Sequence, residues 1–176
     1  MERLDRRDVL GGGATLIAAT FAGSAQGHAR SAAVLPDDHR FMELALAEAA
    51  KAAFPFGAVI VKDNQVIARG HNRTGIDRDP TAHGEMVAIR ACLSAHGPDV
   101  LNGATLYTSG EPCCMCMGAI LWCGLGRLVY AASLAQLSTR VDQIRLSADD
   151  VASKAPFAPI DIAGGVLDEK AMTLFR

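Results

Sequence analysis

The segment "EPCCMCMGAILWC", residues 111–123, holds four of the five cysteines of this chain. An apolar run follows the cysteines, and Pro112 near the start is well tolerated in the first turn of a helix, where its missing N–H would have no helical partner. We therefore predict a helix that has Pro112 in its first turn. On such a helix Cys113 and Cys116 share a face, whereas Cys114 points about 100° away. Cys113 and Cys116 are the pair expected to act together.

Two thiols at a helix N-terminus are suited to a metal ion, because the partial positive charge of that end favours the thiolate form. The best third ligand is His83 in "TAHGE", which lies just before a predicted helix with Thr81 as its cap. Glu85 follows two residues later. Residues at i and i+2 do not share a face of a regular helix. We therefore place His83 at an irregular helix start, where both side chains can enter one cavity.

A set of one histidine and two cysteines predicts a catalytic zinc site, because catalytic zinc keeps three protein ligands and leaves the fourth position to water. A structural site would be closed by a fourth residue. Cys123 lies seven residues past Cys116, about 10 Å along a helix, which is too far to close the same shell. Cys92 and His96 lack ligand spacing, and a ligand from a distant part of the chain stays an open alternative.

The composition fits one soluble domain. The chain has 176 residues, of which 50% are hydrophobic and 20% charged, and this is enough for a core of its own. Lys plus Arg total 17 against 19 Asp plus Glu, so the formal charge is -2. Without a basic excess we expect nucleic acid not to be the partner. No apolar run of about 18 residues is present, so we expect no stable membrane anchor.

Residues 1–29 have the three-part layout of an export signal: a charged start, a Gly-rich apolar stretch and a small polar end. The paired arginines in "MERLDRRDVL" resemble those of a twin-arginine signal, with cleavage after Ala25 or Ala29. We therefore predict a periplasmic or secreted protein whose folded domain is residues 30–176. The alternative is a disordered extension on a cytoplasmic protein.

Hydrophobic periodicity indicates an alternation of helices and strands. Residues 35–54 predict a first helix, and "FGAVIVKDNQVIARGHNR" predicts two antiparallel strands around a turn at residues 62–65. The order of elements predicts an α/β fold, a three-layer α/β/α sandwich around a mixed five-stranded sheet. Residues 135–159 are less regular and predict a helix and a loop. The remaining expected elements are a helix at 84–96, a strand at 104–109, a helix at 113–123, a strand at 127–133, and a short strand and last helix within 160–175.

"HGE" followed by "PCCMC" matches H-x-E…P-C-x-x-C, the signature of zinc-dependent nucleobase deaminases. With "PFGAVIV", "GHNRT", "DPTAHGEMVAIRAC", "LYTSGEPCCMC" and "GAILW", residues 45–133 resemble the cytidine-deaminase-like superfamily. Within it, Phe56 and Trp122 make the chain most similar to bacterial guanine deaminases. Transfer-RNA adenosine deaminases share "DPTAH" and "EPC", and fungal-type cytosine deaminases share the glycine between His and Glu.

The resemblance implies that residues 30–176 form a zinc-dependent hydrolytic deaminase of an aminated heterocyclic base. The substrate expected first is a free purine such as guanine, which would be converted to xanthine and ammonia. The alternatives are that the protein is a tRNA adenosine deaminase, or a cytosine or nucleoside deaminase. Glu85 is expected to take a proton from water and to protonate the ring nitrogen and the departing ammonia. A zinc-stabilised binding module, with Glu85 incidental, is the alternative outside enzymes. Family members are commonly dimers, so a homodimer is expected.

The resemblance also implies how the base is held. Asn72 would hydrogen-bond the base, and main-chain amides near Gly84 and Cys113 would help to hold it. Asp142 is the nearest match to the acidic residue that reads the guanine edge in bacterial guanine deaminases, with a one-residue shift in spacing. The closing tail of those enzymes is not recognisable in "KAMTLFR".

Two aromatic residues are implied to contact the ring. Phe56 and Trp122 would stack on the planar base or form a wall beside it. Each has a plainer alternative as an ordinary core aromatic. Asn72, which follows Gly70 by two residues, could likewise be a turn residue at the end of a strand.

Overall fold

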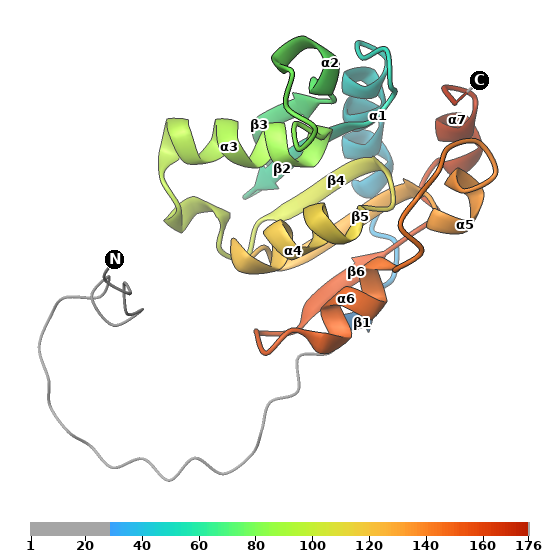
Figure 1. The fold of residues 1–176 in the computed structure, drawn as a ribbon. Coiled ribbons are helices and arrows are strands. Elements are labelled where there is room, and N and C mark those ends of the chain that lie inside the picture. The colour runs from blue at the N-terminus through green and yellow to red at the C-terminus, as the bar shows by residue number, and fades with distance from the viewer. Residues whose placement is uncertain (1–28, 176) are drawn as a thin grey trace, which may run out of the picture.

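The computed structural model describes residues 29–175 (Figure 1). The predicted export signal therefore lies outside the described residues, apart from its last residue, Ala29. This residue begins strand β1 (Ala29–Ser31), which pairs in parallel with a strand near the end of the chain. Cleavage after Ala29 would divide β1, whereas cleavage after Ala25 would leave it whole.

The described strands form one mixed sheet with the order β1-β6-β5-β4-β2-β3. Strand β2 is antiparallel to β3 and β4, while β4, β5, β6 and β1 run parallel to one another. The prediction of five strands was wrong by one, because β1 is only three residues long and lies where the sequence shows no strand pattern. The other strands are β2 (Gly57–Lys62), β3 (Gln65–His71), β4 (Thr105–Gly110), β5 (Arg127–Ala132) and β6 (Ile160–Ala163).

Helices cover both faces of the sheet, which confirms the three-layer α/β/α arrangement (Figure 1). Ala58 and Ile60 of β2 point into a core under α3, α4 and α6, whereas Val59 and Val61 point into a core under α1, α5 and α7. None of the described helices is both long and apolar enough to cross a membrane. The helices on the first face are α3 (Gly84–His96), α4 (Cys114–Trp122) and α6 (Ala148–Lys154), and those on the second are α1 (Asp38–Ala49), α5 (Leu134–Leu137) and α7 (Asp168–Met172).

The predicted hairpin between β2 and β3 is confirmed. Asp63 and Asn64 form its two-residue turn, with positive φ angles of 48° and 61°. Asparagine and aspartate tolerate this left-handed region better than most side chains, which is why the pair suits a tight hairpin. The hairpin places the start of β2 and the end of β3 at the same edge of the sheet.

That edge gathers the chain segments that carry the predicted ligands. The parallel strands β4 and β5 end there, with Gly110 opposite Ala132. The chain leaves β4 toward α4 and leaves β5 toward α5, while α3 begins close to the start of β2. Ligand sites in α/β sheets commonly lie beyond the carboxyl ends of parallel strands.

A buried carboxylate joins the first helix to the sheet. Asp38 is fully buried. The Tyr107 hydroxyl donates to Oδ1 of Asp38 at 2.9 Å, and Nη2 of Arg127 donates to Oδ2 at 2.7 Å. Since Tyr107 lies on β4 and Arg127 on β5, one side chain fixes α1 against both strands. The Arg127 side chain is only 13% exposed, so its charge depends on Asp38 as a partner.

We predict that Asp38→Ala lowers the free energy of unfolding by about 3–5 kcal/mol, because it leaves the buried Arg127 guanidinium without its carboxylate partner and with only the carbonyl oxygen of Ala33 as a hydrogen-bond acceptor among the described residues. Urea denaturation of the zinc-loaded protein measures this. The neighbouring Asp37 has a side chain that is 62% exposed, so Asp37→Ala is the matched control and should change stability by about 0.5 kcal/mol or less. Equal effects of the two substitutions would contradict the role given to Asp38.

Candidate metal centre and catalytic pocket

Two helix N-termini supply the candidate ligands. His83 is the N-cap of α3 and Cys113 the N-cap of α4, and both have extended backbone, with ψ angles of 158° and 165°. The prediction that Pro112 lies in the first turn was wrong, because the helix begins two residues later at Cys114. Cys116 is then the third residue of the helix, and side chains at the N-cap and third positions approach one another as they do in a capping box.

The ligand atoms have the spacing of a tetrahedral metal site. Sγ of Cys113 and Sγ of Cys116 each lie 3.6 Å from Nδ1 of His83. Zinc bonds of about 2.3 Å to sulfur and 2.0–2.1 Å to nitrogen, at tetrahedral angles, would separate these atoms by about 3.6 Å. The donor set therefore fits zinc. Cys114 is outside this group, as predicted.

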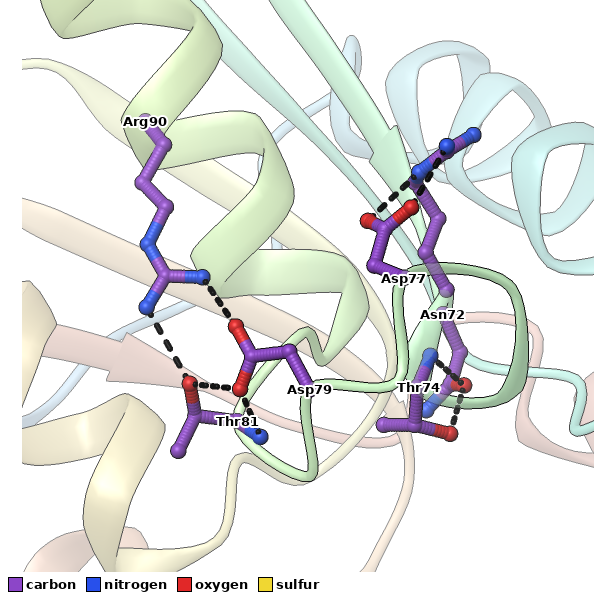
Figure 2. A network of polar contacts seen from close by, with 7 residues as sticks. Asn72, Thr74, Asp77, Asp79, Thr81 and Arg90 are labelled. Carbon is purple, nitrogen blue, oxygen red and sulfur yellow. Dashed lines mark hydrogen bonds and ion pairs between the residues drawn. The ribbon is translucent and has the colours of Figure 1, made fainter.

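The loop before His83 is fixed to the helix that follows it (Figure 2). Oδ1 of Asp79 accepts hydrogen bonds from the amide and the hydroxyl of Thr81, at 2.8 and 2.6 Å. Arg90 on α3 donates to Oδ2 of Asp79 and to the hydroxyl of Thr81. The prediction that Thr81 caps the helix was wrong, because its hydroxyl is used within this network and the N-cap is His83. The network instead holds the segment that delivers the imidazole.

Gly84 allows the start of α3 to approach the sheet closely. A Cβ atom on Gly84 would lie 2.9 Å from the carbonyl oxygen of Phe56 and 3.1 Å from Cα of Gly57. No side chain fits there without a shift of backbone. Gly84 does not line the pocket described below, so its observed role is to seat the helix that carries Glu85.

A cavity of about 160 Å³ lies against the ligand cluster. It brings together most of the residues that the sequence assigned to metal and substrate: His83, Cys113, Glu85, Asn72, Phe56 and Asp142. Phe54, Glu111 and Gln143 also line it and were not singled out as site residues. Glu111 directly precedes Pro112 in the cysteine motif, and this position could have identified it as a site residue. No sequence pattern marks Phe54 or Gln143.

Trp122 is not brought to this cavity. It lies at the C-terminal end of α4, nine residues past Cys113, about 13 Å along the helix. Its ring packs edge-on against Phe157 with 4.8 Å between centroids, and it is 63% exposed. The fold of this chain therefore supplies Phe56, but not Trp122, as an aromatic wall of the pocket.

Asn72 serves both as a turn residue and as a pocket residue. It is buried, and its Oδ1 accepts hydrogen bonds from the amide of Thr74 at 3.2 Å and the hydroxyl of Thr74 at 2.9 Å (Figure 2). These bonds fix the orientation of the side-chain amide and occupy its acceptor oxygen. The Nδ2 donor is the group that Asn72 can offer to a molecule in the cavity.

Glu85 is a buried carboxyl group beside the ligand cluster. It is 3% exposed, its Oε1 accepts a long hydrogen bond of 3.3 Å from Thr108, and its Oε2 lies 3.6 Å from Sγ of Cys116. Burial raises the pKa of Glu85 above its usual range. A carboxyl group with a raised pKa can both accept and return a proton near neutral pH, which suits a general base that also acts as an acid.

The two cysteines differ in their affinity for protons. The hydrogen bond from Cys116 lowers the pKa of Cys113 to about 4, while its hydrogen bond to Cys113 and its burial raise the pKa of Cys116. The hydrogen bond with Cys113 also raises the pKa of His83. The lowered pKa of Cys113 favours its thiolate form, the form in which a cysteine binds a metal ion.

Comparison with known proteins agrees with this geometry. The family model of the cytidine and deoxycytidylate deaminase zinc-binding region matches residues 35–132. A tRNA-specific adenosine deaminase of Agrobacterium fabrum is 38% identical over 140 residues, which cover 77% of this chain and 90% of that protein. A guanine deaminase of Bacillus subtilis is 51% identical over 78 residues, which cover 44% of this chain and 50% of the length of that protein.

A solved structure gives the same result for the fold. The guanine deaminase from Nitrosomonas europaea superposes with a TM-score of 0.65 at 25% sequence identity, and the match covers 87% of each chain. The family match spans more than half of the present chain and includes all three candidate ligands and Glu85. The chain therefore belongs to the family defined by the cytidine and deoxycytidylate deaminase zinc-binding region.

Proposed function

We propose that this protein is a zinc-dependent hydrolytic deaminase of a free aminated purine base, with guanine as the first candidate substrate. The observation that carries this proposal is that Asp142 and Asn72 line the same small cavity as Glu85 and the ligand cluster. The cavity thus joins the groups needed for hydrolysis to groups able to orient a planar heterocycle.

His83, Cys113 and Cys116 would hold the zinc ion. The ion supplies Lewis acidity that makes water a better nucleophile at neutral pH. Two thiolates and a neutral imidazole offset its charge, so a base is still required. Glu85 is the buried carboxylate next to the cluster that can serve as this base.

Glu85 moves protons in both directions during the proposed reaction. Its carboxylate accepts a proton from the attacking water, whose oxygen bonds to the ring carbon that bears the amine. Glu85 then delivers this proton to the adjacent ring nitrogen. It next accepts the remaining proton of the new hydroxyl group and passes it to the amine, so that the C–N bond breaks as the carbonyl forms and ammonia leaves. The overall change is addition of water and loss of ammonia, so one carboxyl group acts first as base and later as acid.

The cavity favours a free base over a phosphorylated one. Its volume of about 160 Å³ is small, and none of the described residues that line it is a lysine or an arginine. Its polar groups include carboxylates, which would repel a phosphate group. A base without phosphate is therefore the better fit.

Asp142 favours guanine over the base of adenosine. Its carboxylate is exposed at the cavity and can only accept hydrogen bonds when ionised. Guanine offers ring N–H donors in addition to the amine that reacts, whereas the base of adenosine offers none. The donor Nδ2 of Asn72 can pair with an acceptor on the same ring. These two groups are complementary to guanine.

Adenosine in tRNA is the second candidate. The relative in Agrobacterium fabrum named as a tRNA-specific adenosine deaminase covers 77% of this chain, so the relatives do not support the expectation that nucleic acid is not a partner. Our preference for a free base rests on the small cavity and on Asp142. Export, the homodimer and the periplasmic location remain predictions.

We predict that Glu85→Gln reduces turnover by about 10²–10⁴-fold while zinc remains bound at one ion per chain, because the substitution removes a proton carrier and no metal ligand. Ammonia release and metal analysis measure the two effects. Cys113→Ser is the contrasting variant and should lose zinc. Full turnover in Glu85→Gln would instead show that Glu85 is not the proton carrier, and absence of turnover in the wild-type protein with zinc bound would support a closed structural site.

We also predict that the zinc-loaded protein releases ammonia from guanine faster than from adenine, cytosine, their nucleosides or a tRNA anticodon stem-loop. Asp142→Asn should lower kcat/KM for guanine by about tenfold or more, because an acceptor at the cavity is lost. Ammonia release only from the anticodon stem-loop would reject the free base and favour the second candidate.

A further inference from the structure

Glu111 is a second buried carboxylate at the pocket, and its partners differ from those of Glu85. It is 6% exposed and follows β4 directly, two residues before Cys113. Its amide donates to the carbonyl oxygen of Ala132 at 2.7 Å, which fixes its backbone at the end of β5. Among the described residues, its side chain forms no hydrogen bond with the candidate ligand atoms or with Glu85, and both of its oxygens are bound elsewhere.

Each carboxylate oxygen of Glu111 accepts a hydrogen bond from the first amide of a different helix. The amide of Leu134 donates to Oε2 at 2.7 Å, and the amide of Ala148 donates to Oε1 at 2.9 Å. Capping boxes at Ser133 and Ser147 satisfy the N-cap and third amides of α5 and α6. The first amide of each helix lies outside such a box and needs another acceptor. Glu111 satisfies both.

The segment between these two amides carries a wall of the pocket. We call residues 134–148 the anchored loop, and within it Asp142 and Gln143 line the cavity. Leu137 near the start of the loop is buried in the core and Val141 packs against it, whereas Ile144 and Leu146 are 65% and 41% exposed, so the part of the loop after Val141 buries little apolar surface. The two hydrogen bonds to Glu111 tie the ends of the loop together and to the end of β4.

We propose that Glu111 is a positioning residue for substrate recognition, which holds both ends of the anchored loop and thereby sets Asp142 against the cavity. With each of its oxygens bound to a backbone amide, Glu111 is not a second general base beside Glu85. The identity of the group that Asp142 reads rests on the proposed function. The anchoring of the loop by Glu111 is independent of the proposed function, because it follows from the two hydrogen bonds to Leu134 and Ala148.

Limited proteolysis tests the anchoring without any assay of turnover. Glu111→Gln keeps one acceptor oxygen but places an NH₂ donor opposite a backbone N–H, so one end of the loop is released. Tryptic cleavage of the zinc-loaded full chain at Arg140 and Arg145, both exposed in the loop, should become about tenfold faster, since cleavage follows the population of the open form. Glu48→Gln is the matched control, because Glu48 is a buried carboxylate whose ion pairs are with Lys51, Arg69 and His71.

A second variant removes the anchor from the other side. Leu134→Pro deletes the amide that donates to Glu111, at the first helical position where proline is well tolerated. The preceding residue, Ser133, already has the extended backbone that proline requires. We expect the same faster cleavage at Arg140 and Arg145. This variant decides the question if Glu111→Gln does not fold.

Kinetics then separate positioning from a general structural role. Glu111→Gln should raise KM for guanine about tenfold and change kcat by about twofold or less, because the loop and not the reacting groups is displaced. In an Asp142→Asn background it should have little further effect, since the two substitutions disturb the same contact. Additive effects on KM would show that Glu111 does not act through Asp142.

The outcomes are distinguishable from failure of the proposed function. If the wild-type protein deaminates none of the free bases but Glu111→Gln and Leu134→Pro both open the loop, the anchor stands and the substrate assignment falls. Wild-type cleavage rates at Arg140 and Arg145 in either variant, with zinc content and circular dichroism unchanged, would overturn the proposal.

Discussion

The site depends on the convergence of two helix N-termini at one edge of the sheet. His83 and Cys113 occupy N-cap positions with extended backbone, and Cys116 lies one turn into α4. This arrangement sets Nδ1 of His83 3.6 Å from each sulfur, which is the ligand-to-ligand distance expected around a tetrahedrally coordinated zinc ion. The close approach of α3 to β2 at Gly84 makes the convergence possible, and the loop network of Figure 2 holds its histidine end.

Two buried carboxylates at this edge have different partners and therefore different chemistry. The contacts of Glu85 with Thr108 and Cys116 are long, and burial raises its pKa, so it is suited to carrying a proton. Glu111 receives two backbone amides at 2.7 and 2.9 Å and is suited to holding structure. Two glutamates that line the same pocket thus have different roles. Glu85 is suited to proton transfer, and Glu111 is suited to holding the anchored loop.

The sequence predicted the metal cluster well because its ligands lie within short motifs whose local geometry follows from helix starts. Local detail was less predictable: the helix expected over residues 113–123 begins at Cys114, because Cys113 has extended backbone as the N-cap, and Pro112 therefore lies outside the first turn. Trp122 was misplaced because its direction depends on packing against Phe157, 35 residues away. The anchor at Glu111 depends on partners 23 and 37 residues distant, which no spacing pattern reveals.

X-ray absorption spectroscopy of the zinc-loaded protein identifies the atoms that bind the metal ion. We expect one zinc ion per chain with two sulfur ligands, one imidazole nitrogen and one light atom from solvent, because three protein ligands leave the fourth position open. A shell of four protein ligands, or a protein that binds no stoichiometric zinc, would contradict it.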